Sequence, residues 1–311
     1  MMRRSGFLLW VTLAIAAIPL ACTSASMTRF KVVYLDMDGT LLNKQHEIPE
    51  RTSRALERYR QCGGKVGIAT GRTAEQVSAY LPKIRPNMPL VLFNGAITTD
   101  SSGEKNLSVQ TLSLMPSLPM VKAALEDPDV RLVVVHYADK TFTDSRLEEV
   151  QDIMGNSHIQ VNETPADLPR RMETFGKTPV KVMLIVKKGT ADTVCQRLAP
   201  HIPTTAKALP TSGLTVEIFS AKANKLNAID AVLKTHALSR RDLLVVGDSG
   251  NDVEMVGGVP AGIAMGNCHP KTCKEALLIA HDNNSDAIPR ILESLAMGPD
   301  CPIDNDKQDT P

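Results

Sequence analysis

Short apolar runs alternate with amphipathic stretches in the first third of the chain. A β-branched run predicts a buried strand over residues 31–35, and apolar residues at helical spacing before Gly63-Gly64 predict a helix over 49–61. The alternation continues with strands predicted over 65–69 and 90–93 and a helix predicted over 73–81. Strands that alternate with helices favour right-handed βαβ units, so this part of the chain predicts a parallel sheet.

The middle of the chain has a different pattern. Its apolar strands are longer and more amphipathic, as over 131–137, 181–186 and 215–219, and turn-rich stretches separate them. No cluster of chemically reactive residues occurs there. We therefore expect residues 98–219 to form an inserted α+β domain with a mostly antiparallel sheet.

The alternating pattern resumes after residue 220. It predicts helices over 223–235, 252–256, 271–280 and 287–295 and strands over 242–246 and 261–265. The whole is an α/β protein with a Rossmannoid, three-layer core of residues 27–97 and 220–297. The Pro- and Asp-rich tail over 298–311 is expected to be disordered.

Composition narrows the possible partners. The 311 residues are 43% hydrophobic and carry a formal net charge of +1, which gives no support for nucleic-acid binding. Aromatic residues make up only 4%, so a platform for stacking bases is also not expected. The oligomeric state is not predicted by any pattern in the chain.

The first 26 residues are separate from the predicted fold. Arg3 and Arg4 precede an apolar run over 7–21 and small residues over 21–25, which is the layout of a signal peptide. The run is shorter than the roughly 20 residues of a membrane span. Alternatively, the leader is an over-extended start and translation begins at Met27. The protein would be exported or lipid-anchored in the first case and cytoplasmic in the second.

Cysteines beyond Cys22 are odd in number and widely spaced. They are Cys62, Cys195, Cys268, Cys273 and Cys301. This spacing shows neither a disulfide framework nor a metal site, so we expect buried or incidental thiols.

The chemistry-bearing residues follow the predicted parallel strands. Asp36 and Asp38 come directly after the first strand, Thr70 follows the second, and Asp248 follows the strand over 242–246. Carboxyl ends of parallel strands meet at one edge of a sheet, so these groups are expected to lie together. Burying carboxylates without partners is costly, which makes a structural role for Asp36 unattractive.

Each group suits one part of a phosphoryl transfer. Asp36 can attack phosphorus, and Asp38 can act as general acid and then as base. Asp36, Asp248 and Asp252 offer the hard oxygen ligands that Mg²⁺ prefers. Thr70 can bind a phosphoryl oxygen, and Lys225 can offset the negative charge. Further candidate phosphate- or substrate-binding residues are Met37, Gly39, Gly71, Asn94 and Asn251.

Four segments resemble the motifs of the haloacid dehalogenase (HAD) superfamily. They are Asp36-Met37-Asp38-Gly39-Thr40-Leu41, Ile68-Ala69-Thr70-Gly71-Arg72, Asn224-Lys225 and Gly247-Asp248-Ser249-Gly250-Asn251-Asp252. Their order and spacing, with the segments over 93–96 and 262–267, resemble those of the Cof-like phosphatases with a type C2B cap. The resemblance covers residues 30–297.

The resemblance implies a mobile cap and Mg²⁺-dependent dephosphorylation of small phosphate esters, often sugar phosphates. It makes Asp36 the nucleophile and Asp38 the acid/base, with the main-chain carbonyl of Asp38 as a further Mg²⁺ ligand. Lys222 lies three residues before Lys225 and competes with it for the same role.

The leading hypothesis is therefore a phosphatase acting on a small phosphorylated metabolite through an aspartyl-phosphate. A phosphomutase uses the same groups and is the alternative enzyme. A non-catalytic sugar-phosphate binding protein is the alternative outside the enzyme class. The ester itself is not predicted, because the inserted domain that would select it carries no diagnostic cluster.

Overall fold

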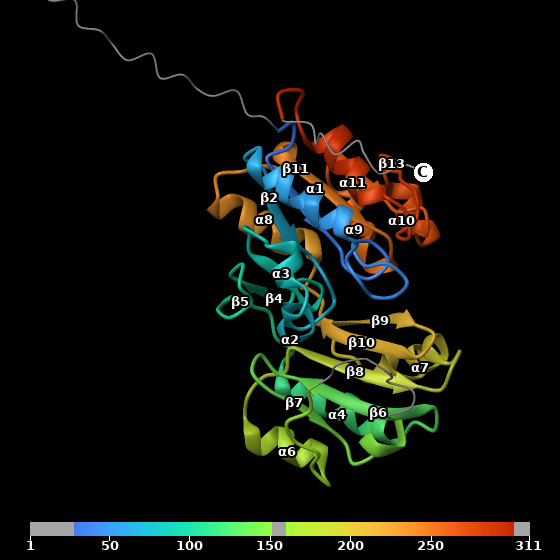
Figure 1. Cartoon of the computed structure of the whole chain (residues 1–311). Coiled ribbons are helices and arrows are strands. Elements are labelled where there is room, and N and C mark those ends of the chain that lie inside the picture. Colours follow the sequence, from blue (N-terminus) through green and yellow to red (C-terminus); the bar gives the residue numbers. More distant parts are fainter. Residues whose placement is uncertain (1–27, 151–159, 302–311) are drawn as a thin grey trace, which may run out of the picture.

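A parallel sheet lies at the centre of the upper unit of the molecule in Figure 1, a computed structural model that describes residues 28–150 and 160–301. The strand order is β13-β12-β11-β1-β2. The strands are β1 Val32–Leu35, β2 Lys65–Ile68, β11 Leu243–Gly247, β12 Ala261–Ala264 and β13 Leu278–Ile279. All neighbouring pairs are parallel, which confirms the predicted α/β core.

Helices cover both faces of this sheet because both faces of its strands are apolar. Val33 and Leu35 point to the face covered by α1 (Glu50–Gln61) and α11 (Ala287–Ile291). Val32 and Tyr34 point to the opposite face, against α8 (Lys225–Thr235) and α9 (Val253–Gly257). The result is the predicted three-layer arrangement, with β1 between β11 and β2 in the sheet.

The chain leaves this core through a small antiparallel sheet. β3 (Leu90–Leu92) contacts the β2 side through one parallel bridge, Ala69–Val91, and then pairs with β4 (Ile97–Thr99). β5 (Asn106–Val109) pairs with β4 in turn. The predicted domain boundary at 97–98 falls inside β4. We propose that the cap begins after β5.

The lower unit in Figure 1 is built on a second sheet, of order β7-β6-β8-β10-β9. Its strands are β6 Val130–His136, β7 Thr141–Thr143, β8 Lys181–Val186, β9 Ala206–Ser212 and β10 Thr215–Ser220. Every pairing is antiparallel, as predicted. One face packs on α4 (Leu114–Glu126), α6 (Leu168–Phe175) and α7 (Ala191–Leu198).

Two predicted helices differ from the observed ones. In place of one helix over 73–81, the structure has α2 (Ala74–Ser78) followed by α3 (Leu81–Ile84). Thr73 and Gln76 form a capping box at the start of α2. The helix predicted over 271–280 is wrong in its second half, since α10 (Pro270–Glu275) ends and β13 follows. Leu278 and Ile279 instead pair with β12 and extend the sheet by one strand.

Short turns complete the described chain. They are 3₁₀ turns at Phe93–Gly95, Leu147–Val150, Ala199–His201, Arg240–Asp242 and Gly250–Asp252, and a π-helical turn at Leu292–Ala296 that continues α11. Within residues 28–150 and 160–301, no helix combines the length and the apolar character that crossing a bilayer requires. The predicted leader lies outside the described residues.

Two disulfides correct the prediction of incidental thiols. Cys62 at the end of α1 is bonded to Cys301, 239 positions away, and Cys268 is bonded to Cys273. Cys195 is free. The first pair could not be predicted from the cysteine spacing, because the two cysteines meet only after the chain has folded. Cys301 is buried, so the prediction of disorder is wrong for residues 298–301, whereas 302–311 lie outside the described residues.

Removing the long-range disulfide is expected to destabilise the protein. A cross-link that closes so long a loop stabilises a folded chain by about 2–5 kcal/mol. Cys62→Ser should therefore lower the melting temperature by several degrees, measured by calorimetry, whereas Cys195→Ser should not. An unchanged melting temperature in Cys62→Ser would show that this bond adds no stability.

Candidate active site

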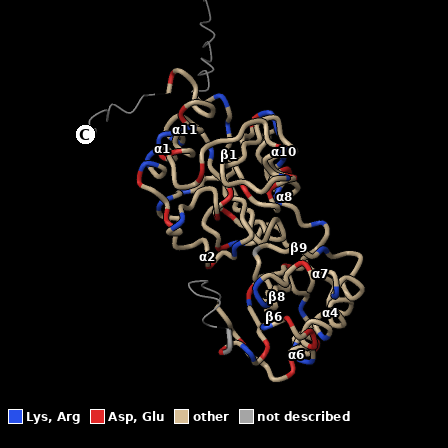
Figure 2. The backbone as a smooth tube through the Cα atoms, turned by 90° about the vertical axis from the view of Figure 1, so that its right-hand side faces the viewer, with Lys and Arg blue, Asp and Glu red and all other residues tan. Residues whose placement is uncertain are grey.

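The predicted site residues meet at the carboxyl edge of the core sheet, where it faces the cap. Asp36 follows β1, Thr70 follows β2 and Asp248 follows β11, and all three line one cleft of about 960 Å³. Residues of cap strands β6, β8, β9 and β10 line the same cleft. In Figure 2, acidic positions gather between β1 and the cap. The predicted juxtaposition of distant strand ends is therefore observed.

A buried lysine connects two of the carboxylates. Lys225 Nζ, at the start of α8, donates to Asp36 Oδ1 and to Asp252 Oδ1, both at 2.7 Å. All three residues are buried, with Asp252 fully enclosed. Asn224 caps α8 by accepting from two main-chain N–H groups, which fixes the first turn that carries the lysine. Lys222, the competing candidate, is exposed.

The carboxylate of Asp248 is held by side chains other than Lys225. Its Oδ1 accepts from Thr40 Oγ1 at 2.9 Å, and its Oδ2 lies 3.4 Å from the donor Asn267 Nδ2. Gly39 has a φ of +76°, and a Cβ there would lie 2.2 Å from Asp248 Oδ2. Any side chain at position 39 would therefore displace this carboxylate.

Burial and crowding oppose the charged state of these acids. Burial and the neighbouring charge of Asp252 raise the pKa of Asp36 well above its usual value. The same two causes raise the pKa of Asp248 to about 7. Burial alone would lower the pKa of Lys225, but Asp252 and Asp36 outweigh it and raise this pKa instead. The lysine is therefore a permanent cation that compensates only part of the negative charge.

The acidic cluster fits a divalent cation. Carboxylate oxygens of Asp36, Asp248 and Asp252 lie within 4.8 Å of one another. Both oxygens of Asp252 already accept hydrogen bonds, Oδ1 from Lys225 and Oδ2 from the main-chain N–H groups of Asp248 and Ser249. We therefore expect Asp36 and Asp248 to be the direct ligands, with Asp252 orienting them. Hard oxygen donors of this kind suit Mg²⁺.

Asp38 lies apart from the buried cluster, at the cleft surface. Its two oxygens accept from Arg72 Nε at 2.7 Å and Nη2 at 2.6 Å, and His46 Nδ1 lies 3.7 Å away. Its side chain remains 49% exposed. The two aspartates after β1 thus occupy different surroundings, one enclosed with a lysine and one at the surface with an arginine.

Of the remaining predicted residues, Thr70, Gly71 and Asn251 line the cleft, whereas Met37 and Asn94 are not among its lining residues. Thr70 is buried, and its Oγ1 accepts from the Arg72 N–H at 3.2 Å. Asn94 has a left-handed backbone (φ +55°) and accepts at Oδ1 from Asn251 Nδ2 at 2.8 Å. The Met37 side chain is buried in the core and its carbonyl closes the turn by accepting from two N–H groups.

Three ionisable residues of the cap line the cleft and were not predicted as site residues. His136, Lys181 and Glu217 line it from β6, β8 and β10. A single charged residue within each of two apolar strands was the available signal. It was weak because strand polarity alone does not tell which face of the cap sheet meets the core.

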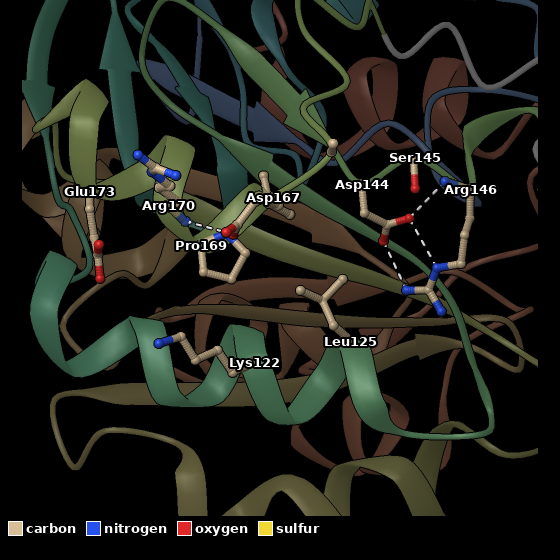
Figure 3. Close-up of a pocket in the computed structure, with 11 residues that line it drawn as sticks. Lys122, Leu125, Asp144, Ser145, Arg146, Asp167, Pro169, Arg170 and Glu173 are labelled. Atoms are coloured by element: carbon tan, nitrogen blue, oxygen red, sulfur yellow. Dashed lines mark hydrogen bonds and ion pairs between the residues drawn. The ribbon is translucent and has the colours of Figure 1, made fainter.

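A second cavity, of about 780 Å³, lies within the cap (Figure 3). Arg146 pairs with Asp144 there, and Asp167 caps the helix by accepting from the Arg170 N–H. No aspartate of the acidic cluster lines this cavity. It is therefore separate from the site at the sheet edge.

Comparisons with known proteins agree with this geometry. Residues 33–292 match the model of the haloacid dehalogenase-like hydrolases. A Bacillus subtilis protein named 5-amino-6-(5-phospho-D-ribitylamino)uracil phosphatase is 26% identical over 274 residues, which are 86% of this chain and 97% of that protein. The HMP-PP phosphatase of Cronobacter sakazakii is 27% identical over 253 residues, or 77% of this chain and 85% of that protein.

Solved structures share the fold. The HAD subclass IIB sugar phosphatase BT4131 superposes with a TM-score of 0.72 at 21% identity, covering 85% of this chain and 98% of that one. The motif segments, the acidic cluster and the match over residues 33–292 point the same way. The chain belongs to the haloacid dehalogenase-like hydrolase family, and the two relatives named above, which it matches along most of their length, are named phosphatases.

Proposed function

We propose that the protein hydrolyses small phosphate monoesters with Mg²⁺, through an aspartyl-phosphate on Asp36. The carrying observation is the placement of Asp36 itself. Its carboxylate is buried at the sheet edge, touches Lys225 through Oδ1 at 2.7 Å and opens into the cleft shared with the cap. That placement suits a nucleophile better than a structural acid, because burying a carboxylate in a cavity is costly.

The proposed reaction has two steps. Asp36 attacks phosphorus, the bond between phosphorus and the leaving oxygen breaks, and Asp38 gives that oxygen a proton. Asp38 then takes a proton from water, whose oxygen attacks phosphorus and releases phosphate and free Asp36. Thr70 and Lys225 bind the phosphoryl oxygens. Mg²⁺ on Asp36, Asp248 and the Asp38 carbonyl would supply charge neutralisation at the transferring group.

Arg72 sets a condition on the proton transfer. Both oxygens of Asp38 accept from this one guanidinium in the substrate-free protein. One oxygen has to leave the arginine before Asp38 can reach the leaving group. Substrate binding is the event that we expect to release it, since the ester oxygen would then compete for the same carboxyl.

Phosphate release from an aryl phosphate tests the proposal. We expect turnover with Mg²⁺ and none after chelation with EDTA, and restored activity when Mg²⁺ is added back. Turnover that is unaffected by EDTA would remove the metal from the mechanism. A protein that releases no phosphate from any ester in a panel of phosphorylated metabolites would contradict the hydrolase assignment and favour the binding protein.

The phosphomutase alternative makes a different prediction. A mutase returns phosphate to the organic part, so it depends on a bisphosphate activator and retains the phosphate that a hydrolase releases. Isomerised phosphate esters formed without free phosphate would favour the mutase. The relatives named above act on different esters, and this variety leaves the ester of this chain open within the class of small phosphorylated metabolites.

Metal binding should depend on pH in the range set by Asp248. Its folded pKa of about 7 lies above the unfolded value near 3.8. The metal-free folded state therefore binds more protons between these values and loses stability as pH rises through them. Mg²⁺ binds the deprotonated acids, so we expect it to raise the melting temperature more at pH 8 than at pH 5.5. An equal rise at both pH values, at matched ionic strength, would contradict this.

We also propose that the protein is exported. Two disulfides join four of its cysteines, and such bonds persist in oxidising compartments. The basic and apolar leader agrees with this. N-terminal sequencing of the mature protein distinguishes a start near Thr23 from a start at Met27. A start at Met27 would contradict export and favour a cytoplasmic protein.

A further inference from the structure

We propose that the cleft selects monophosphates whose organic part is uncharged, and that it discriminates against a second phosphate on the leaving group. This inference rests on the proposed phosphatase function and specifies its substrate class. It follows from the charges that line the cleft and from the pairing of its cations.

The described residues that line the cleft include two permanent cations, and each has a carboxylate partner. Arg72 binds Asp38 through two hydrogen bonds. Lys181 binds Glu217 Oε1 through Nζ at 2.7 Å, with side chains 4% and 11% exposed. Against these two cations stand four acids, namely Asp36, Asp38, Asp248 and Glu217. Mg²⁺ would offset the two acids that remain, and the reacting phosphate would then add negative charge of its own.

Lys181 and Glu217 of this buried pair each make a further contact with the core. Lys181 Nζ also approaches the Gly71 carbonyl at 3.3 Å, and the second oxygen of Glu217 accepts from Asn94 Nδ2 at 2.9 Å. These contacts join cap strands β8 and β10 to the core loops that follow β2 and β3. A leaving-group phosphate that recruited the lysine would compete with Glu217 for its charge, and breaking the buried pair would leave a carboxylate without a counter-charge.

The buried histidine of the cap does not supply the missing cation. His136 lies beside Lys181 on the neighbouring strand and is buried under the same face. Its burial and the lysine charge lower its pKa well below the usual value, so the ring stays neutral. The other histidine among the described cleft-lining residues is His46, whose Nδ1 lies 3.7 Å from Asp38 Oδ1. Residues 151–159, outside the described part of the chain, contain one histidine, His158, and neither lysine nor arginine.

The rest of the cap wall is neutral. It consists of the aliphatic side chains Met183, Ile185, Leu209 and Leu214 and the hydroxyls of Thr211 and Thr215, which hydrogen-bond each other at 2.7 Å. A second dianion placed against this wall would lose water without gaining a counter-charge, which weakens its binding. An uncharged organic part meets no such penalty. The mutase alternative is disfavoured for the same reason, because its intermediate carries two phosphates.

Matched esters test the inference by binding. Calorimetry on Asp36→Asn with Mg²⁺ would compare glucose 6-phosphate with glucose 1,6-bisphosphate, and fructose 6-phosphate with fructose 1,6-bisphosphate. We expect each bisphosphate to bind at least about tenfold more weakly than its monophosphate. Equal or tighter binding of the bisphosphates would overturn the proposal, and so would failure of every monophosphate to bind.

Two variants locate the cause on the cap. Glu217→Gln removes the charge that neutralises Lys181 and should narrow the difference between mono- and bisphosphate. Thr215→Lys adds a cation to the wall without touching the buried pair and should narrow it as well, even if Glu217→Gln folds poorly. An unchanged difference in Thr215→Lys would contradict the charge argument. Wild-type phosphate release is measured separately, so a failed hydrolase assignment and a failed charge selection give different results.

Discussion

Replacing Asp36 with asparagine is expected to reduce phosphate release by at least about a thousandfold, because it removes the attacking carboxylate. The amide oxygen can still accept from Lys225, so the local hydrogen bond and the fold should persist. The substitution also removes the buried negative charge of Asp36, which the neighbouring charge of Asp252 repels. We therefore expect Asp36→Asn to be inactive yet as stable as the wild type, or more stable.

Release of phosphate and the melting temperature should be measured on the same preparation. Asp139→Asn is the control, since Asp139 is exposed on the cap and pairs with Lys177. Retention of full activity by Asp36→Asn would sink the aspartyl-phosphate mechanism. A separate readout is the intermediate itself. Asp38→Ala lacks the base for the second step, whereas an aryl leaving group can depart without the proton that Asp38 otherwise gives. With an aryl phosphate this variant should therefore accumulate labelled, hydroxylamine-sensitive phosphate on the protein after an acid quench.

The sequence predicted that Asp36, Thr70 and Asp248 meet, because all three follow the ends of parallel strands. The place of Asp36, Thr70 and Asp248 follows from a parallel sheet whose strand order brings their ends to one edge. Residues more than two hundred positions apart could be joined in this way without any contact being known. The sequence alone could not decide between Lys222 and Lys225, because the choice depends on which lysine points inward where α8 begins.

Other features depend on tertiary contacts that no local pattern encodes. The bond between Cys62 and Cys301 requires the end of α1 and the end of the chain to meet. The strand β13 forms because Leu278 and Ile279 find an open sheet edge, which overrides their place in a predicted helix. Lys181 and Glu217 meet across β8 and β10 on the face of the cap sheet that happens to cover the core.

Substitution of Lys225 by methionine is expected to be the second severe change. The side chain is 1% exposed and joins Asp36 to Asp252. Without it, two buried carboxylates face each other with no cation, which costs about 3–5 kcal/mol. We expect Lys225→Met to lower both the melting temperature and phosphate release, the latter by about a hundredfold or more. Added Mg²⁺ should recover part of the stability, since it neutralises the same cluster, but not the lost phosphate ligand.

Lys222→Met is the matched control, three positions away and exposed to solvent. It should change stability by no more than about 0.5 kcal/mol and leave phosphate release intact. The reverse result, an active Lys225→Met and an inactive Lys222→Met, would assign the role to the other lysine. Loss of activity without loss of stability in Lys225→Met would mean that Asp36, whose pKa is already raised, takes up a proton once the lysine is gone. The substitution would then remove the attacking carboxylate and leave the fold intact.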